Sequence, residues 1–446
     1  MRVGAIGLGD PGYSEKLAQQ CHEQAVARIR RTVPDLVDVG LQCDDRFSND
    51  AVVRLVKAHA DQPFDALFLV QASWGRPAVT LQVIRALPQL PMVLYSPGGE
   101  VIDGVIRTIA SVTGAASNLS ALRSNGIKFK HVWSVPGKSI DEAAFLPFLR
   151  AAAAIRKLRG AKLGMVGFGD MRLHATAFDV EEVHRTFGIE VDAVDMLELQ
   201  KEMNALDERS LSEQAASLTA AWTYHNGKQP PADALKKVVG AYIVLDRWAS
   251  ERGWIGIDTK CVTGLAQHMG FTPCLTGSLL ARKYCYQCEN DIPGLLTQVI
   301  LRALSGATTG YWELYEVLAD GLLMACCGFC PESLLDEPMK VRTFEQFFTG
   351  LGCCAQVKQG PYTVGRIGKS REGHYLFHRV EGEAVSPPAW YEAALGMPQH
   401  PSVNFRPDTP IETLMANLLA QHVAVVPGRW KSAVDEFAGL LGMASG

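Results

Sequence analysis

Residues 288–306 read CENDIPGLLTQVILRALSG, and they join a short apolar run to a helix. Apolar residues recur here at helical spacing, so one face of the helix is expected to lie in a core. These residues are Leu295, Leu296, Val299, Ile300, Ala303 and Leu304. Asp291 or Asn290 can cap the start, and Pro293 suits the first turn. Gly306 suits the C-terminal end. A helix needs only one capping residue. The presence of a further acid, Glu289, directly after an apolar run with two cysteines therefore needs another explanation.

Strand-like and helical segments alternate over the first 300 residues around this stretch. The strand-like segments are RVGAIGLG (2–9), LVDVGLQC (36–43), ALFLVQASW (66–74) and MVLYSPGG (92–99), and later KLGMVGFGD (162–170), IEVDAVDM (189–196) and GIDTKCVTGL (256–265). Such alternation predicts βαβ units and a parallel sheet, and the restart near residue 162 predicts two of them. Residues 145–160, FLPFLRAAAAIRKLRG, are predicted to be the helix that links the two units.

Beyond Gly306 the pattern changes to short β-like segments separated by glycine, proline and charged turns. Examples are YTVGRIG (362–368), HYLFHRVEGEAV (374–385) and HVAVVPG (422–428), and a final helix is expected in RWKSAVDEFAGLLGM (429–443). The predicted fold class is therefore α/β: two open parallel-sheet α/β domains, then a smaller, mainly β C-terminal domain with a closing helix. The predicted domains span residues 1–158, 159–305 and 306–446.

The composition of the chain excludes several classes of protein. It has 446 residues, 48% hydrophobic and 20% charged, with a net charge of −4, as in ordinary globular proteins. Neither the charge balance nor any basic tract indicates a nucleic-acid partner. No apolar run approaches the roughly 18 residues of a membrane span. Asp10 comes too early for a secretory signal, so a cytoplasmic location is expected.

The N-terminal segment Gly7-Leu-Gly9-Asp-Pro-Gly12 fits the pattern GxGxxG after a strand, as a dinucleotide site would. Pro11 removes an amide, however, and Asp10 places negative charge where a phosphate would lie. We interpret this segment as a tight strand-to-helix turn and predict no cofactor-binding residues there.

The eleven cysteines include two CxxC pairs, Cys285/Cys288 and Cys327/Cys330. Four cysteines can hold a structural zinc, but 38 residues separate these pairs, whereas zinc ribbons usually have about 15 to 20. A redox dithiol in CGFC is the other alternative. Buried packing of reduced thiols is the interpretation that competes with both.

Acidic residues in apolar surroundings point to a different kind of site. Glu289 precedes the helix, and Glu313 follows it 24 residues later in TTGYWELYEV, with Glu316 close by. Carboxylates rarely tolerate apolar-aromatic surroundings unless they are paired or bind a metal. Two carboxylates with a neutral imidazole would suit Mn²⁺ or Mg²⁺. The late histidines available are His374, His378, His400 and His422.

Four segments resemble the fucose/arabinose isomerase-like proteins. They are residues 157–199, residues 256–280, residues 284–306 with Cys-Glu-x-Asp before a helix, and residues 420–443 with His-x-x-x-Val-x-Gly and the closing helix. The resemblance implies a divalent metal, commonly Mn²⁺ with Mg²⁺ as the alternative, held by an acid of the Cys-Glu-x-Asp motif, a second acid after the helix and a late histidine. The matching residues are Glu289, Glu313 and His422, with Glu316 as the alternative to Glu313.

The activity that the resemblance implies is aldose–ketose isomerisation of a sugar or modified sugar through an enediol. This reaction needs a base beside the carbonyl, an acid to return the proton, and a cation to stabilise the enediolate. Glu289 and Glu313 would be the catalytic acid/base pair as well as metal ligands. His422 would be a ligand only, oriented by its second ring nitrogen. A metal-dependent epimerase or lyase, or a non-catalytic sugar-binding protein, are the alternatives.

The chain also departs from the family pattern. Where the family usually has His-Cys-Gly-x-x-Pro, residues 326–331 read CCGFCP, which favours a three-ligand arrangement. Trp74 and Met171 match segments that face the sugar, Trp74 often from a neighbouring subunit, and Lys260 is a weaker candidate. The resemblance thus also implies a homo-oligomer, with a trimer or hexamer as the options.

Overall fold

The computed structural model describes residues 1–43, 50–343, 350–388 and 401–445. The chain divides into two compact units, Met1–Arg156 and Lys157–Gly446, and the second contains both a parallel sheet and an antiparallel barrel. The division into three domains predicted from the sequence stays a prediction. The predicted fold class is confirmed, because parallel sheets with flanking helices precede a C-terminal β region.

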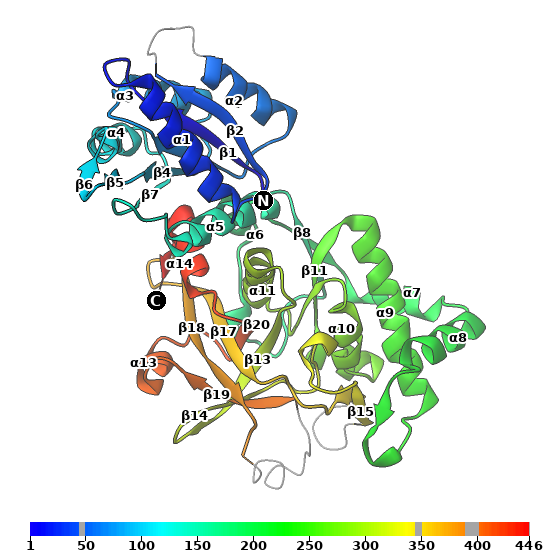
Figure 1. Cartoon of the computed structure of the whole chain (residues 1–446). Coiled ribbons are helices and arrows are strands. Elements are labelled where there is room, and N and C mark those ends of the chain that lie inside the picture. Colours follow the sequence, from blue (N-terminus) through cyan, green and yellow to red (C-terminus); the bar gives the residue numbers. More distant parts are fainter. Residues whose placement is uncertain (44–49, 344–349, 389–400, 446) are drawn as a thin grey trace. The chain divides into compact units, whose positions relative to one another are not determined.

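Unit 1 is built around a five-stranded parallel sheet with the order β2-β1-β3-β4-β7 (Figure 1). The strands are β1 (Val3–Leu8), β2 (Leu36–Gln42), β3 (Ala66–Gln71), β4 (Met92–Ser96) and β7 (Phe129–Trp133). The helices are α1 (Glu15–Arg30), α2 (Asp50–Asp61), α3 (Pro77–Ala86) and α4 (Ser111–Ser124), and a hairpin of β5 (Glu100–Ile102) and β6 (Val105–Arg107) precedes α4. Every residue of β1, β3 and β4 is buried, as expected for central strands of a parallel sheet.

The glycine-rich turn after β1 is closed by its own side chains. The buried carboxylate of Asp10 accepts hydrogen bonds from the Gly12 amide at 2.9 Å and from Nε of Arg76 at 2.8 Å. A Cβ at Gly7 would lie 2.7 Å from Nδ1 of His22, so this position requires glycine for close packing. The turn therefore has a structural explanation, in agreement with the interpretation from the sequence.

The parallel sheet of unit 2 has the order β12-β11-β8-β9. Its strands are β8 (Lys162–Val166), β9 (Glu190–Val194), β11 (Trp254–Thr259) and β12 (Cys285–Cys288). After α5 (Leu146–Leu158), which spans the boundary between the units, the helices are α6 (Val180–Phe187), α7 (Met196–Asn204), α8 (Glu208–Thr219), α9 (Ala232–Arg252), the π-helix η4 (Cys261–Met269), α10 (Cys274–Leu280) and α11 (Ile292–Ser305). The predicted linking helix is α5, which carries the chain from one unit into the other.

Six antiparallel strands of unit 2 form a closed ring, β17-β20-β13-β14-β19-β18 and back to β17. They are β13 (Gly310–Leu318), β14 (Gly321–Ala325), β17 (Gly360–Lys369), β18 (Tyr375–Val385), β19 (Ser402–Pro407) and β20 (His422–Pro427). The strand β21 (Ala444–Ser445) adds to β18, and α13 (Ile411–Ala416) and the closing helix α14 (Lys431–Leu441) complete the region. A small sheet joins β10 (Thr223–Tyr224), β15 (Lys340–Thr343) and β16 (Leu351–Cys353). Short 3₁₀ turns are η1 (Glu142–Ala144), η2 (His174–Thr176), η3 (His225–Gly227) and η5 (Glu332–Leu334).

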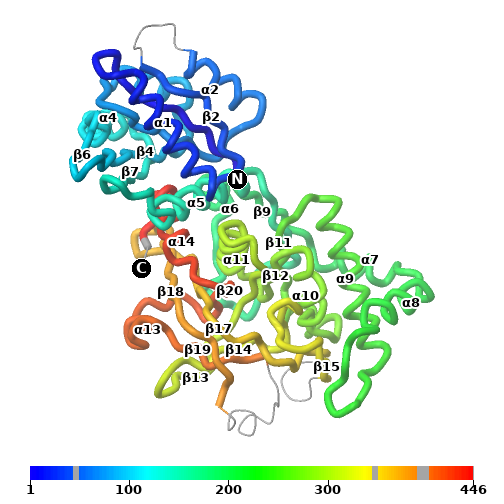
Figure 2. Tube along the Cα trace, viewed as in Figure 1, coloured from blue at the N-terminus to red at the C-terminus, as the bar shows by residue number. Residues whose placement is uncertain are grey.

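Helix α11 lies between the parallel sheet and the barrel, and it contacts β11 and β12 on one side and β17 and β20 on the other (Figure 2). The predicted face does lie in a core, and the burial extends beyond it, since eleven of the fourteen residues of α11 are buried. Two of its buried polar side chains donate hydrogen bonds: Thr297 to the Pro293 carbonyl at 2.7 Å, and Gln298 to the Tyr286 carbonyl at 2.7 Å. The loops at the two ends of α11 consequently reach both the sheet and the barrel.

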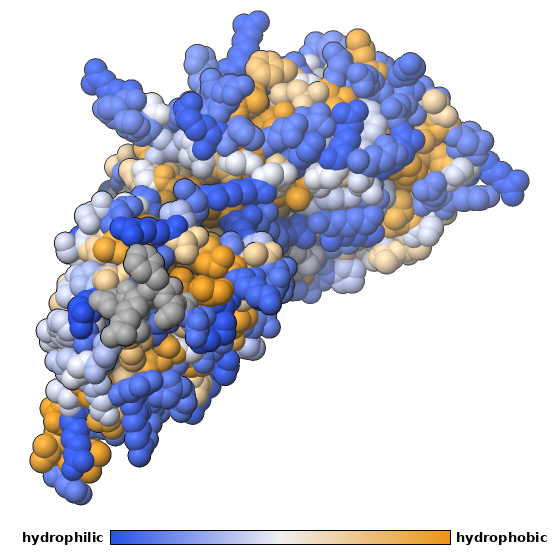
Figure 3. Space-filling view, turned by 90° about the horizontal axis from the view of Figure 1, so that it is seen from above, coloured by the Kyte–Doolittle hydropathy of each residue, from blue (hydrophilic) through white to orange (hydrophobic). Residues whose placement is uncertain are grey.

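The surface drawn in Figure 3 mixes hydrophilic residues with small groups of hydrophobic ones. Within the part of the chain that the structure describes, no helix is both long enough and apolar enough to cross a membrane.

Candidate metal and active site

The connection from β12 to α11 has an unusual backbone. Glu289 and Asn290 are both left-handed, with φ of 67° and 52°, a conformation that costs a residue with a Cβ roughly 1–2 kcal/mol. Asn290 fixes the turn, because its Nδ2 donates to the carbonyl of Val166 at the end of β8 at 3.2 Å. Such strain concentrates where a side chain must be aimed in a particular direction. Here Oε2 of Glu289 lies 3.5 Å from Nε2 of His422.

Glu313 and His422 face each other across two neighbouring barrel strands. They are register partners in the antiparallel pair β13–β20, and Oε1 of Glu313 lies 3.2 Å from Nε2 of His422. Glu316, the alternative to Glu313, is exposed and lies beyond a register shift in the same strand. The structure therefore brings Glu313, and not Glu316, together with His422.

The other ring nitrogen of His422 is held by Asp291. Nδ1 of His422 lies 2.8 Å from Oδ2 of Asp291, whose Oδ1 also accepts the Gly294 amide at 3.1 Å and so caps α11. Arg366 of β17 donates to both carboxylate oxygens of Asp291, at 2.6 and 2.8 Å, and both side chains are almost fully buried. The predicted capping role of Asp291 is confirmed, but this residue also orients the histidine.

The buried charges shift one another's ionisation. Burial raises the pKa of Glu289 to about 8, with a further rise from the Glu313 carboxylate and a partial offset from His422. Burial acts to lower the pKa of His422, but its hydrogen bonds to Asp291 and Glu313 outweigh this and raise the pKa to about 10. Burial also disfavours the charged form of Asp291, yet Arg366 and His422 hold the pKa of this carboxyl well below its usual range.

The ligand atoms of Glu289, Glu313 and His422 all lie within 4.8 Å of one another. Two neighbouring ligand atoms that bind one small cation at about 2.0–2.1 Å would lie about 3 Å apart. The distances from Nε2 of His422 to the carboxylate oxygens of Glu289 and Glu313 are close to this value, at 3.5 and 3.2 Å. Two carboxylate oxygens and an imidazole nitrogen suit a hard or borderline divalent cation such as Mg²⁺ or Mn²⁺. The donor set therefore fits the metal expected from the resemblance.

A loop after β8 lies at the same carboxyl edge of the parallel sheet as Glu289. The buried carboxylate of Asp170 accepts the amides of Val262 and Thr263, at 2.7 and 2.8 Å, and thereby fixes the loop to the start of η4. Met171, the predicted substrate contact, is left-handed with φ of 44° and is 38% exposed. Lys260 follows β11 and donates to the Phe168 carbonyl at 3.3 Å. In α/β sheets ligands bind at this edge, and the roles of Met171 and Lys260 stay predictions.

Trp74, the other predicted substrate contact, belongs to unit 1. It follows β3, is partly buried, and stacks on Tyr13 with ring centroids 6.0 Å apart. Its predicted role in binding sugar is not tested by this packing.

The cysteines are free thiols and most of them are buried. Sγ of Cys288 lies 2.8 Å from the Tyr311 hydroxyl, and Tyr311 stacks on Phe329 of the CGFC segment at 5.0 Å. Among the described residues, only Glu289, Glu313 and His422 form a group of three or more histidine, cysteine or acidic side chains that could hold a metal ion. Neither CxxC pair is therefore part of a candidate metal site. The cysteines beside Glu289 serve in packing.

Two further charged residues of this region were not predicted. Arg366 is 1% exposed in β17, and the lone charged residue in YTVGRIG was the available signal. Asp258, in the apolar segment WIGIDT, is fully buried in β11 beside Gln287 of β12. Burial, with the nearby Asp291 carboxylate, raises the pKa of Asp258 well above its usual range.

The C-terminal region is similar to a known family. Residues 331–445, which include most of the barrel, match the family described as L-fucose isomerase, C-terminal domain. With the relatives below, this match makes the chain similar to fucose isomerase-like proteins.

The similar proteins of known name are described more narrowly than the family. A sulfoquinovose isomerase of Clostridium sp. (strain MSTE9) is 27% identical over 87% of this chain and 86% of its own. A sulfoquinovose isomerase of Alkalicoccus urumqiensis is 23% identical over 83% of this chain and 81% of its own. A solved periplasmic sugar-binding protein of Legionella pneumophila covers 69% of this chain and 97% of its own at 12% identity, but its TM-score of 0.19 is too low to inform the fold.

Proposed function

We propose that this protein is a metal-dependent aldose–ketose isomerase acting on a modified sugar, with sulfoquinovose as the first substrate to test. The observation that carries the proposal is the convergence of Glu289, Glu313 and His422 at the junction of the parallel sheet and the barrel. The names of the relatives support sugar isomerisation in general, rather than action on fucose or arabinose in particular.

A divalent cation, most reasonably Mn²⁺, would be held by Glu289, Glu313 and His422. When bound, it would stabilise the negative charge that develops on the oxygens of the substrate during proton transfer. His422 would bind through Nε2, because Nδ1 is engaged by Asp291. Arg366 keeps Asp291 ionised and in place, which fixes the direction of the imidazole ring.

The two glutamates would move the proton. In the change from aldose to ketose, a base removes the proton on C2 and an acid returns a proton to C1, while the hydroxyl proton shifts between the two oxygens. The side chain of Glu289 is 8% exposed, so its carboxyl is largely shielded from water, whereas the side chain of Glu313 is 17% exposed. The pair thus offers one shielded and one more accessible carboxyl for the two halves of the reaction, and which of them acts as the base is left open.

The test is turnover of sulfoquinovose, followed by NMR in D₂O with metal-stripped and Mn²⁺-loaded protein. Glu289→Gln is expected to lose both Mn²⁺ binding and turnover. Glu316→Gln is the matched control, because Glu316 is an exposed glutamate three residues from Glu313 on the same strand. Interconversion of an aldose and its ketose supports the proposal, whereas an epimer or a cleaved sugar in the products contradicts it. Turnover unchanged in Glu289→Gln would also contradict it.

A homo-oligomer in the cytoplasm would accord with the resemblance, and light scattering of the purified protein tests the assembly. The trimer and hexamer predict distinct masses.

A further inference from the structure

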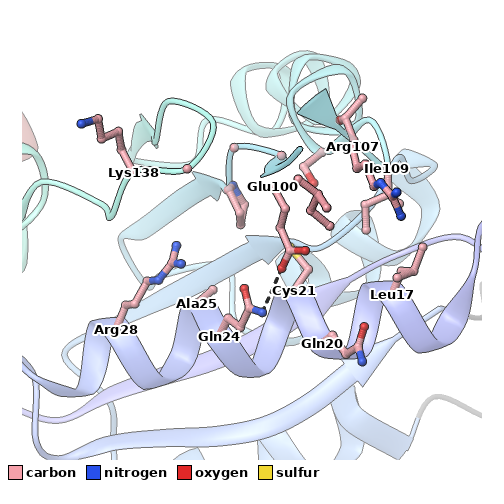
Figure 4. A pocket seen from close by; sticks show the side chains of 17 residues that line it. Leu17, Gln20, Cys21, Gln24, Ala25, Arg28, Glu100, Arg107, Ile109 and Lys138 are labelled. Atoms are coloured by element: carbon pink, nitrogen blue, oxygen red, sulfur yellow. Dashed lines mark hydrogen bonds between the residues drawn. The ribbon is translucent and has the colours of Figure 1, made fainter. Parts of the chain in front are cut away.

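Unit 1 contains a cavity of about 220 Å³ that the isomerase proposal does not use. One wall is α1, where Leu17, Cys21, Gln24 and Arg28 lie on one face (Figure 4). The opposite wall is the segment 97–111, which follows β4 at the carboxyl edge of the sheet, with residues 137 and 138 at the end. This edge is where α/β sheets commonly bind ligands.

The wall that follows β4 begins with two glycines that are closely packed and tied by hydrogen bonds. A Cβ at Gly98 would lie 2.6 Å from the Ser134 carbonyl oxygen, and one at Gly99 would lie 2.5 Å from the Arg107 carbonyl oxygen. The Gly98 amide donates to Oγ of Ser134 at 3.0 Å, and the Gly137 amide donates to the Gly99 carbonyl at 3.0 Å. A site of this kind binds a ligand without first paying to order its own backbone.

The charges around the cavity are unbalanced. Arg28, Arg107 and Lys138 line it with a single carboxylate, Glu100, which leaves a formal charge of +2. Throughout the described ranges, none of these three cations forms an ion pair. In Figure 4 Glu100 reaches from the loop toward α1, where its carboxylate accepts a hydrogen bond from Nε2 of Gln24 at 3.0 Å, while Arg28 and Arg107 lie on opposite sides of it.

This arrangement defines the chemistry of a ligand. The cations favour an anionic group, whereas Glu100 disfavours a bare anion and accepts hydrogen bonds from hydroxyl groups. Gln20, Thr108 and Ser111 add further hydrogen-bonding groups to the lining. The volume is below the roughly 300–1,000 Å³ usual for drug-sized ligands, so a small metabolite fits better than a dinucleotide.

We propose that this cavity binds a small hydroxylated anion, a sugar phosphate or a sugar acid, at a second site of the protein. Every lining residue belongs to unit 1, whereas Glu289, Glu313 and His422 belong to unit 2.

The experiment is isothermal titration of the full-length Glu289→Gln variant in EDTA, so that the metal site cannot contribute. The probes are glucose 6-phosphate and gluconate, with glucose and inorganic phosphate as comparisons. Saturable binding of either anionic sugar, at least about tenfold tighter than that of both comparisons, is expected. Arg107→Gln, on the exposed hairpin, and Arg28→Gln should each weaken it about tenfold. Arg85→Gln, an exposed helical arginine of unit 1 outside the cavity, is the matched control.

Absence of saturable binding of both anionic sugars up to about 10 mM would overturn the proposal. Equal binding of inorganic phosphate would also overturn it, as would a loss in Arg85→Gln as large as in Arg107→Gln. Arg107→Gln keeps the test decisive if Arg28→Gln unfolds, because Arg28 also interacts with the hydroxyl of Tyr95. None of these titrations measures isomerase activity. A failure to bind the anionic sugars would therefore leave the proposed isomerase function untouched, and a failure of the isomerase test would leave this binding proposal untouched.

Discussion

Replacing Asp291 by asparagine removes one charge from the most deeply buried ion pair of the site. Asp291 and Arg366 have side chains 0% and 1% exposed and share two hydrogen bonds, and Asp291 also holds Nδ1 of His422. Asparagine has nearly the same shape and still caps a helix, so the substitution creates no cavity and keeps the Gly294 contact. What it removes is the compensation for the buried guanidinium.

The magnitude follows from this loss. Removing one partner of a buried ion pair typically destabilises a protein by about 3–5 kcal/mol, because the remaining charge is left without compensation. We expect a loss of that size in the free energy of unfolding of the metal-free protein. Metal affinity should also fall about 10- to 100-fold, because the imidazole of His422 loses the acceptor that orients it.

The assay is urea unfolding in EDTA, with the same substitution at Asp207 as the control. Asp207 is the N-cap of α8 and accepts the Ser210 amide at 2.8 Å, but it is exposed and has no buried cation to neutralise. Asp207→Asn should therefore change the free energy of unfolding by less than about 0.5 kcal/mol. Adding Arg366→Met to Asp291→Asn should recover part of the loss, since the uncompensated charge is then gone.

Equal costs for Asp291→Asn and Asp207→Asn would refute this reasoning. The ion pair would then contribute nothing to stability beyond the helix cap. A double variant that loses the sum of the two single losses would refute it independently, because the cost would not come from an uncompensated charge.

Three further predictions concern the ionisation and charge of the site. The pKa values of Glu289 and His422 are about 8 and 10 in the metal-free protein, so Mn²⁺ binding at pH 7 should release about two protons, and the affinity should rise with pH. Calorimetry in buffers of different ionisation enthalpy measures the number of protons released. A Mn²⁺ affinity that does not change with pH from about 6.5 to 8 would contradict this prediction. The raised pKa of Asp258 means that the folded state keeps a proton that the unfolded state has lost above its usual pKa, so stability falls as pH rises over that interval. Asp258→Asn should flatten this dependence in thermal unfolding from pH 5 to 8, and an unchanged slope would count against it. If the substrate carries a sulfonate, Lys260→Gln should raise KM for it about tenfold with little change in kcat, whereas equal effects on a neutral sugar would exclude a charge contact.

The sequence predicted the α/β architecture because hydrophobic periodicity reports local structure. The seven predicted strand-like segments before residue 300 each contain a sheet strand, and the helix from Ile292 to Ser305 has its predicted cap. The strands β7 and β12 were not predicted, and residues 261–265 of the last predicted segment belong to the π-helix η4. Hydrophobic periodicity shows which face of a segment is apolar, however, and not which distant segments pack against it. The burial of α11 on nearly all sides depends on β17 and β20, which come from residues more than 50 positions later and pack on its second face.

The three residues of the candidate site could be named from the sequence, but the ion pair and the backbone conformation that hold them in place could not. Glu289 precedes α11 and Glu313 lies in β13, which follows it, but the sequence alone did not show that the two carboxylates meet. His422 was chosen through the family resemblance. The Asp291–Arg366 pair joins positions 75 apart, and no local pattern signals such a pairing. The left-handed backbone at Glu289 was also unpredictable, because tertiary contacts, and not residue preference, impose it on a glutamate.

The position of Nε2 of His422 between two carboxylates has a consequence for how a metal would enter. With its pKa near 10, the metal-free ring carries a proton on Nε2 at neutral pH, and this proton bridges to Glu313 where a cation would otherwise sit. Exchange of this proton and that of Glu289 for one divalent ion leaves the net charge of the buried site unchanged. Loading is then electroneutral, so metal binding would add no uncompensated charge to this buried region.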